Sequence, residues 1–168
     1  RIAILDHDDA RHLLEDASML ERVFQRSQRI GASVIETKAK IDGLTGRCLW
    51  DLKSYGGRNP LTVHVANNEI GHRNYHGQLG YYESVMGRAV EVESYAWIFV
   101  SKEDLDVVVL EADAGSDTMV AGQEMAEGAL AKYAECAASG GWPGVAPAKV
   151  VAELPGWMLA DDGDVADD

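Results

Sequence analysis

Two carboxylates and one lysine stand at matching places in two short extended stretches of this chain. Residues 40–43 read Lys-Ile-Asp-Gly, and residues 49–53 read Leu-Trp-Asp-Leu-Lys. Alternate side chains of a strand point the same way, so Asp51 and Lys53 share one face. If the first stretch pairs with the second as a hairpin through residues 44–47, Asp42 comes to lie near Asp51. This pattern limits the chain to folds that gather charged groups where neighbouring strands meet.

Two oxygen ligands beside an ammonium group are what a Mg²⁺-assisted phosphodiester hydrolase requires. The carboxylates hold the cation, which stabilises the developing charge on phosphorus and acidifies a water molecule. Lys53 would position that water or neutralise charge. The competing interpretation is ordinary surface charge at strand ends, because Asp-x-Lys is a common sequence. The apolar neighbours of Asp51 favour a site.

Three further polar residues are candidates for the same site. Gln78 and Tyr82 lie four apart on one face of a predicted helix, where they could hydrogen-bond a phosphate or orient the lysine. Glu36 shares a strand face with Asp42 and is a candidate outer or additional metal ligand. A solvated or ion-paired side chain is the alternative for Glu36.

The hydrophobic periodicity predicts an α/β (α+β) protein with a mixed central β-sheet flanked by helices. The expected helices span residues 8–29, 61–68, 73–86 and 116–139. The expected strands span 34–42, 47–54, 94–101 and 105–111. We expect one domain over residues 1–160 and an acidic, disordered tail over 161–168, in which five of eight residues are Asp.

The formal net charge of −13 argues against a protein that is basic overall. A nucleic-acid partner would therefore need a local basic strip and metal ions. The candidate residues for the strip are Arg26, Arg29, Lys38, Lys40, Lys53, Arg58 and Arg73. No apolar run approaches the length of a membrane span, so no membrane partner is expected. Two widely separated cysteines fit a reducing, cytoplasmic location.

Other chemistries find weaker support in the sequence. His72 and His76 are four residues apart, but no His-Glu-x-x-His arrangement and no nearby third ligand accompany them. The chain has no Gly-x-Ser-x-Gly nucleophile turn and no Walker-type phosphate loop. Zinc, serine-nucleophile and nucleotide-triphosphate chemistry are therefore not expected.

Taken with residues 75–82 (Tyr-His-Gly-Gln-Leu-Gly-Tyr-Tyr), the two strand motifs resemble PD-(D/E)xK nucleases of the RecB-like branch. That branch places a Gln-x-x-x-Tyr helix after the Asp-x-Lys strand. Residues 133–136 (Tyr-Ala-Glu-Cys), 141–144 (Gly-Trp-Pro-Gly) and 154–157 (Leu-Pro-Gly-Trp) resemble more narrowly the C-terminal nuclease domain of exonuclease VIII (RecE-type) and its phage and prophage relatives. The resemblance extends from about residue 36 to residue 157.

The resemblance implies a restriction-endonuclease-like core and a Mg²⁺-dependent exodeoxyribonuclease, with Mn²⁺ as a substitute cation. Its substrate would be the ends of linear double-stranded DNA, degraded 5′ to 3′ to leave 3′ single strands for recombination. Asp42, Asp51 and the backbone carbonyl of Leu52 would bind the metal, Lys53 would activate the water, and Gln78 and Tyr82 would support the site. A single-strand annealing protein and a ring-shaped homo-oligomer are the implied partners.

One departure from the family pattern concerns the start of the chain. The family carries a metal-proximal histidine on a helix well before the first Asp, and only 41 residues precede Asp42 here. That upstream helix is expected to be missing, and the contexts of His7 and His12 do not match it. The missing helix and the acidic charge favour an alternative, a catalytically impaired nuclease fold that binds DNA or a partner. A RecB-like endonuclease is a further alternative.

Overall fold

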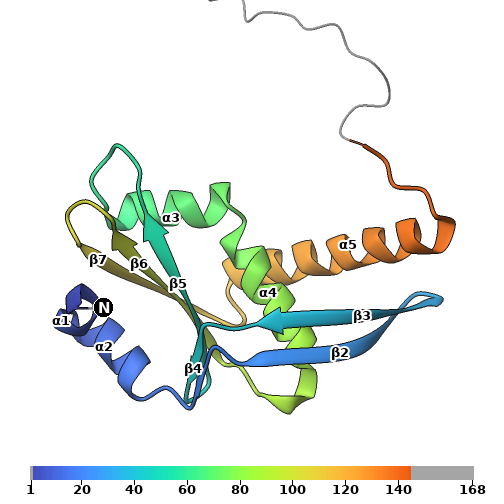
Figure 1. The fold of residues 1–168 in the computed structure, drawn as a ribbon, viewed down its shortest axis with the longest axis horizontal. Coiled ribbons are helices and arrows are strands. Elements are labelled where there is room, and N and C mark those ends of the chain that lie inside the picture. Colours follow the sequence, from blue (N-terminus) through green and yellow to red (C-terminus); the bar gives the residue numbers. More distant parts are fainter. Residues whose placement is uncertain (1, 145–168) are drawn as a thin grey trace, which may run out of the picture.

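The computed structural model describes residues 2–144, which form a five-stranded mixed sheet with helices on both faces (Figure 1). The strand order is β1-β4-β5-β6-β7, in which β5 and β6 are parallel and the other pairs antiparallel. The predicted fold class is confirmed. The strands of this sheet are β1 (Met19–Leu20), β4 (Gly43–Thr45), β5 (Cys48–Tyr55), β6 (Ser94–Ser101) and β7 (Val107–Asp113).

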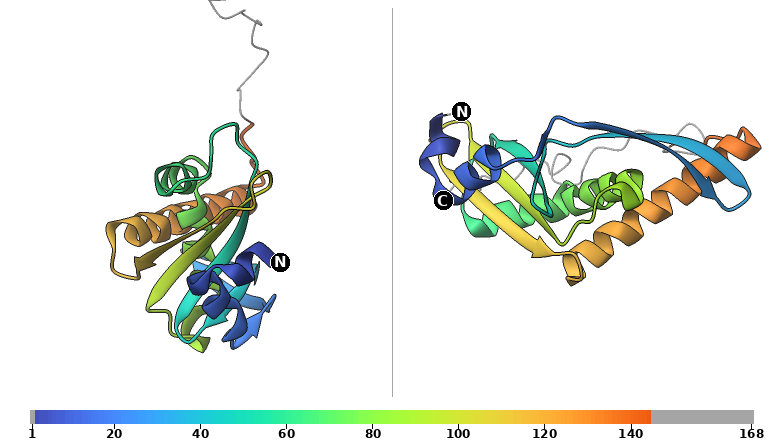
Figure 2. Two further views of the ribbon diagram at one scale, coloured as in Figure 1. Left: turned by 90° about the vertical axis from the view of Figure 1, so that its left-hand side faces the viewer. Right: turned by 90° about the horizontal axis from the view of Figure 1, so that it is seen from below.

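The two faces of the sheet carry separate hydrophobic cores, because side chains alternate along the central strand β6. Tyr95, Trp97 and Phe99 point into the larger core, which is covered by three helices. Ala96 and Ile98 point into the smaller core on the opposite face. The larger core lies under α3 (Val63–His72), α4 (Tyr75–Met86) and α5 (Asp117–Ser139), and the smaller under α1 (Ile2–Asp6) and α2 (Asp8–Glu15) (Figure 2).

A long two-stranded arm extends from the sheet and consists of β2 (Val23–Ile30) and β3 (Ser33–Lys40) (Figure 1). The arm continues the pairing of β1 with β4 without a change of register. Between the two pairs, Ile41 N–H donates to the Arg22 carbonyl and Glu21 N–H to the Asp42 carbonyl, both at 3.0 Å. One antiparallel hairpin therefore begins in the main sheet and leaves it at Glu21 and Asp42.

The prediction of a helix over residues 8–29 is wrong beyond Glu15. Helix α2 ends there, and the following residues form β1 and β2. Pairing with residues 33–44 gives this segment the backbone hydrogen bonds that a helix would otherwise supply. The half-buried side chains of Phe24, Gln28 and Ile30 lie on one face at alternate positions, which is a strand pattern. Tertiary pairing thus overrides the helical spacing of Val23 and Phe24.

The predicted pairing of strand 34–42 with strand 47–54 is also corrected. Strand β3 pairs with β2 instead, and only the three residues of β4 pair with β5, from Gly43 opposite Trp50 to Thr45 opposite Cys48. The indole of Trp50 occupies the space that a side chain at position 43 would need. Its Nε1–H donates to Thr45 Oγ1 at 3.0 Å, so the short hairpin is fixed by one aromatic ring.

The remaining elements lie close to their predicted positions. Ser116 caps the start of α5, and Gly140 ends it with a φ of 69°. A short 3₁₀ turn, η1 (Gly87–Ala89), follows α4. The expected acidic tail over 161–168 and the motif at 154–157 lie outside the described residues. Among residues 2–144, no helix has both the length and the apolar content that a bilayer crossing requires.

Candidate active site

Strand β5 places Asp51 and Lys53 on the face covered by α4, as their spacing predicts. Asp51 is 2% exposed, and its carboxylate forms an ion pair with the Lys53 ammonium. The neighbours Trp50 and Leu52 point to the opposite face, where Trp50 joins the smaller core. A buried carboxylate on an apolar strand is costly unless it is paired, and Lys53 supplies that pairing.

The bend at which the arm leaves the sheet places Asp42 beside β5. Asp42 Oδ2 accepts a hydrogen bond from the backbone N–H of Leu52 at 2.9 Å. Asp42 is close enough to Asp51 to raise the pKa of that carboxyl through both charge and hydrogen bonding. The expected meeting of the two carboxylates therefore occurs, although it is produced by the bend and the short β4 rather than by a long hairpin.

The amide of Gln78 connects the strand residues to α4. Lys53 Nζ donates to Gln78 Oε1 at 2.7 Å, while Gln78 Nε2 donates to Asp51 Oδ1 at 3.3 Å and to the Tyr82 hydroxyl oxygen at 2.6 Å. An ammonium group only donates, so the amide oxygen must face Lys53 and the amide nitrogen the other two groups. Gln78 and Tyr82 thus belong to one hydrogen-bonded cluster with Asp51 and Lys53.

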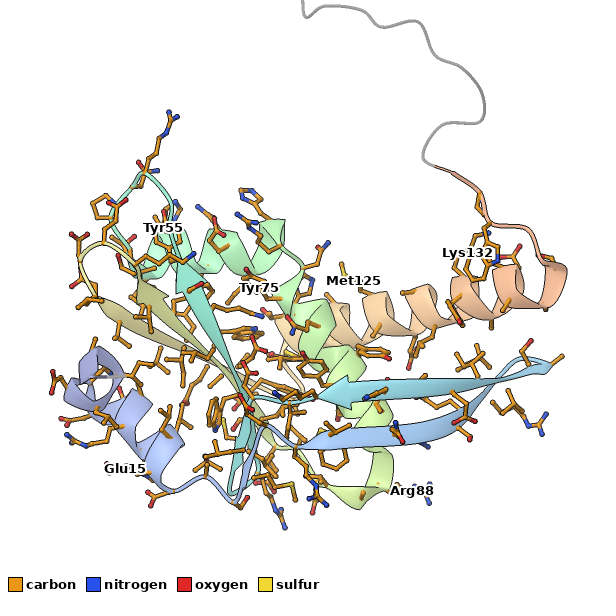
Figure 3. All side chains as sticks on the ribbon, in the orientation of Figure 1. Glu15, Tyr55, Tyr75, Arg88, Met125 and Lys132 are labelled. Atoms are coloured by element: carbon orange, nitrogen blue, oxygen red, sulfur yellow. The ribbon has the colours of Figure 1, made fainter. Side chains whose placement is uncertain are left out.

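The sequence interpretation gave no role to Tyr75, which also contacts this cluster. Tyr75 lies at the start of α4 (Figure 3). The Lys53 ammonium lies over its ring, 4.1 Å from Nζ to the ring centroid, and the ring packs against Phe99 with the two ring centroids 6.1 Å apart. Such a cation–π contact favours the charged lysine and fixes its position. The signal was present in the sequence, because Tyr75, Gln78 and Tyr82 have the i, i+3, i+7 spacing of one helix face.

Burial makes the Asp51 carboxyl a weaker acid than an exposed aspartate. It raises the pKa of Asp51 to about 6; Lys53 opposes this rise and Asp42 adds to it. Burial also raises the pKa of Tyr82, with Gln78 opposing the rise and both carboxylates adding to it. Perturbed carboxylates of this kind are typical of functional sites, because an unshielded buried charge destabilises the fold.

The carboxylate pair suits a hard divalent cation. Asp51 Oδ2 is buried and lacks a partner in hydrogen-bond geometry, although Lys53 lies within ion-pair distance. A cation would satisfy that oxygen and remove the repulsion between Asp51 and Asp42. Among the described residues, no cluster of three or more His, Cys, Asp and Glu side chains could hold a metal. Further ligands would thus come from backbone carbonyls, such as that of Leu52, and from water.

A cavity of about 670 Å³ reaches Asp42 from the α1–α2 side of the sheet. Leu20, Leu52 and Trp50 form part of its apolar wall, and Glu21 lies at its edge beside Asp42. The site carboxylate on the bend is therefore open to molecules that approach from outside. Asp51 and Lys53, in contrast, are enclosed by β5 and α4.

The other predicted residues lie away from this cluster. Glu36 is exposed on the arm and accepts a hydrogen bond from Ser27. It lies six residues before Asp42, which corresponds to about 20 Å along a strand. His7 caps α2, and His12 pairs with Asp16 at 2.6 Å.

Among known proteins, similarity to this chain is found at the level of the fold. No family profile and no curated protein matches the sequence. The crystal structure of a protein named as a putative exonuclease from Eubacterium rectale matches with a TM-score of 0.57 and 12% identity. The match covers 97% of this chain and 64% of that one. The two proteins share a fold.

A second solved structure, that of SSO0001, has a TM-score of 0.47 and 15% identity over 89% of this chain and 69% of the other. That similarity is too low to add to the argument. This chain spans 64% of the length of the Eubacterium rectale protein. The comparison therefore supports the arrangement of strands and helices around the candidate site, and it does not bear on the chemistry of the site residues.

Proposed function

We propose that this protein is a Mg²⁺-dependent exodeoxyribonuclease that acts on the ends of linear double-stranded DNA. The observation that carries the proposal is the single hydrogen-bonded cluster of Asp51, Lys53, Gln78 and Tyr82, with Asp42 alongside. The similarity to the Eubacterium rectale protein supports a nuclease fold beneath it.

Each residue of the cluster has a distinct role in phosphodiester hydrolysis. Asp42 and Asp51 would hold Mg²⁺ or Mn²⁺, with the Leu52 carbonyl as a further ligand. The bound cation would neutralise charge on the phosphate and increase the acidity of the attacking water. Lys53 orients that water and offsets negative charge at phosphorus. Gln78 and Tyr75 hold the lysine in place, and Tyr82 anchors Gln78.

The finer features follow from the sequence resemblance to RecE-type enzymes. We propose degradation from the 5′ end, which leaves 3′ single strands for recombination. A single-strand annealing protein would receive those strands, and protomers would assemble as a ring around the duplex. The enzyme would act in the cytoplasm of a bacterium or a phage-infected cell.

A comparison of end-labelled linear duplex with closed circular duplex tests the activity. We expect the linear DNA to be degraded with Mg²⁺, to survive with EDTA, and to lose nucleotides first from the 5′ label. The circular DNA should remain intact. Cleavage of circles would instead indicate a RecB-like endonuclease, and survival of both substrates would contradict the proposal.

A second candidate function is a nuclease fold that binds DNA or a recombination partner without cutting it. The small number of carboxylates at the site of the described chain favours this alternative, because metal affinity rises with the number of charged ligands. Titration with Mn²⁺ by calorimetry separates the two candidates. Binding that is lost in Asp51→Ala favours the enzyme, whereas absence of binding in the wild-type protein favours the non-cutting module.

A further inference from the structure

The arm differs in charge from the rest of the protein. Residues 22–40 contain five Lys and Arg residues and one Glu, which gives a net charge of +4. The whole chain carries −13, so the remainder carries −17. Such segregation concentrates positive potential on one projecting element, where an anionic partner would be attracted.

The two faces of the arm have different environments. On the inner face, Ile35 packs against Leu130 and Ala134 of α5, and Arg26 donates to the Ser84 carbonyl of α4 at 2.8 Å. On the outer face every side chain is exposed. The cross-strand pairs of that face are Val23 with Lys40, Gln25 with Lys38, Ser27 with Glu36, and Arg29 with Val34.

The outer face leads directly to the candidate active site. Positions 34, 36, 38 and 40 alternate along β3, so Lys38 and Lys40 lie on the outer face, and Asp42 follows two residues beyond Lys40 at the bend. The distance from position 34 to position 42 is about 26 Å along the extended chain, which equals the rise of about eight base pairs along the axis of a DNA duplex. A molecule that lies along this face therefore reaches Asp42 at its end.

We propose that the outer face of the arm binds the phosphate backbone of the nucleic acid whose end enters the site. The inference rests on the proposed function. Arg29 and Lys38 contact successive parts of the backbone, and Lys40 exchanges its 2.9 Å contact with Glu21 for a phosphate. Glu36, which lies between them, weakens the attraction. An acidic protein is a less suitable partner for this face, because its surface would bring further carboxylates beside Asp42 and Asp51.

Binding without hydrolysis tests the proposal in the full-length protein. Fluorescence anisotropy with a labelled duplex of about 20 base pairs, in Ca²⁺ or EDTA, compares two double variants with the wild type. Arg29→Gln/Lys38→Gln removes two charges from the outer face. Arg88→Gln/Lys132→Gln removes the same two residue types at the foot of α4 and on α5 (Figure 3). Both pairs are exposed, so neither change should disturb the core.

The arm variant should bind at least about tenfold more weakly at 0.1 M salt, and its slope of log affinity against log salt should fall by about 2. The control variant Arg88→Gln/Lys132→Gln should change the affinity and the salt slope less than the arm variant does. Glu36→Gln should instead tighten binding by about threefold, because one charge of the same sign as the phosphates is gone. This gain cannot result from a failure to fold.

Equal affinity and equal salt slope in the two double variants would overturn the proposal. So would an arm variant that binds DNA normally but has a smaller molar mass by light scattering, because the arm would then be an interface between copies. The proposed nuclease activity and the proposed role of the arm can be contradicted independently. Wild-type protein that binds DNA through the arm without cutting it contradicts the nuclease activity alone. Cutting that is insensitive to the arm variant contradicts the arm alone.

Discussion

Asp51 lies 2% exposed on a strand that is otherwise apolar, where loss of hydration opposes ionisation. Lys53 and Gln78 compensate for part of that loss by an ion pair and a hydrogen bond. They do not compensate for all of it, because the pKa of Asp51 is still raised to about 6 by burial, against the pull of Lys53. The metal-free site is therefore under electrostatic strain that a cation would relieve.

This strain predicts that Asp51→Asn stabilises the metal-free protein at neutral pH. A folded-state pKa of about 6 against an ordinary 3.8 means that ionisation costs the folded state free energy. The stabilising effect of the protonated carboxyl is complete below about 3.8 and is lost as the pH rises through about 6. The full shift corresponds to about 3 kcal/mol, and loss of the Lys53 ion pair reduces the net gain to about 2 kcal/mol.

Thermal unfolding in EDTA between about pH 4 and pH 8 measures this effect. The melting temperature of the variant should exceed that of the wild type at pH 8, and the two should converge toward pH 4. Added Mn²⁺ should stabilise the wild type and leave the variant nearly unchanged. A variant that is less stable than the wild type at pH 8 would contradict the strained-carboxylate account.

Lys53→Ala should abolish hydrolysis and leave metal binding largely intact. Its ammonium touches Asp51, the Gln78 oxygen and the Tyr75 ring, and only the first of these is a candidate metal ligand. A fall in the rate of about a hundredfold or more is typical of losing a group that stabilises developing charge. Single-turnover cleavage and Mn²⁺ calorimetry separate the two readouts; unchanged cleavage would disprove the role of Lys53.

At the scale of elements, α4 carries Gln78 and Tyr82 to the strand, and α5 holds α4 in position. The two helices approach closely because glycines face each other across the contact. A methyl group on Gly80 would come within 2.7 Å of the Gly122 backbone, and one on Gly122 would overlap the carbonyl of His76. The position of the site residues on α4 therefore depends on a contact that no other residue type permits.

Gly80→Ala should destabilise the protein by about 2–3 kcal/mol, because the helices must separate to admit the added carbon. Movement of α4 should also weaken the Gln78 bridge and lower the cleavage rate. Gly128→Ala is the matched control, since this exposed position on α5 has nothing within 4 Å of the added carbon. That change should stabilise the protein by about 0.5–1 kcal/mol through helix propensity.

Urea unfolding of both variants, together with their cleavage rates, checks the comparison. Equal stability of Gly80→Ala and Gly128→Ala would show that the α4–α5 contact is loose. A destabilised Gly80→Ala protein that cleaves at the normal rate would show that the site residues do not depend on the packing of α4 against α5.

At the scale of the described molecule, residues 2–21 and 41–144 carry −13 and the arm carries +4, and this separation produces opposing electrostatic effects. Acidic groups repel each other throughout the body of the protein, and the arm is attracted to that body. Ion pairs such as Arg47 with Glu91 and Lys132 with Glu135 are exposed and contribute little. Net repulsion should therefore dominate the effect of salt on stability.

We expect the melting temperature in EDTA to rise when salt is raised from about 0.01 M to about 0.15 M, because the Debye length falls from about 30 Å to about 8 Å. The same change should weaken DNA binding, since the phosphate contacts depend on released counterions. Calorimetric scans at the two salt concentrations measure the first effect. A lower melting temperature at high salt would show that attraction between arm and body outweighs repulsion within the body.

The sequence alone predicted the mixed sheet, most of its elements and the residues of the cluster. The placement of these side chains follows from local information: alternation puts Asp51 and Lys53 on one strand face, and helical spacing puts Gln78 and Tyr82 on one helix face. Their roles in catalysis stay a prediction. The predicted helix over 116–139 similarly agrees with α5, which Ser116 caps and Gly140 ends. Short-range geometry is encoded by the order of the side chains.

Only the tertiary structure decided how these pieces meet. Residues 16–29 were predicted to be helical, but β1 and β2 form there instead, because a partner strand offered backbone hydrogen bonds. The bend at Glu21 and Asp42 brought the first carboxylate beside the second, and the same bend directed the arm away from the sheet. Tyr75 entered the site because α4 was docked against β5. Contacts between distant segments depend on how whole elements pack, and no periodicity within one segment records them.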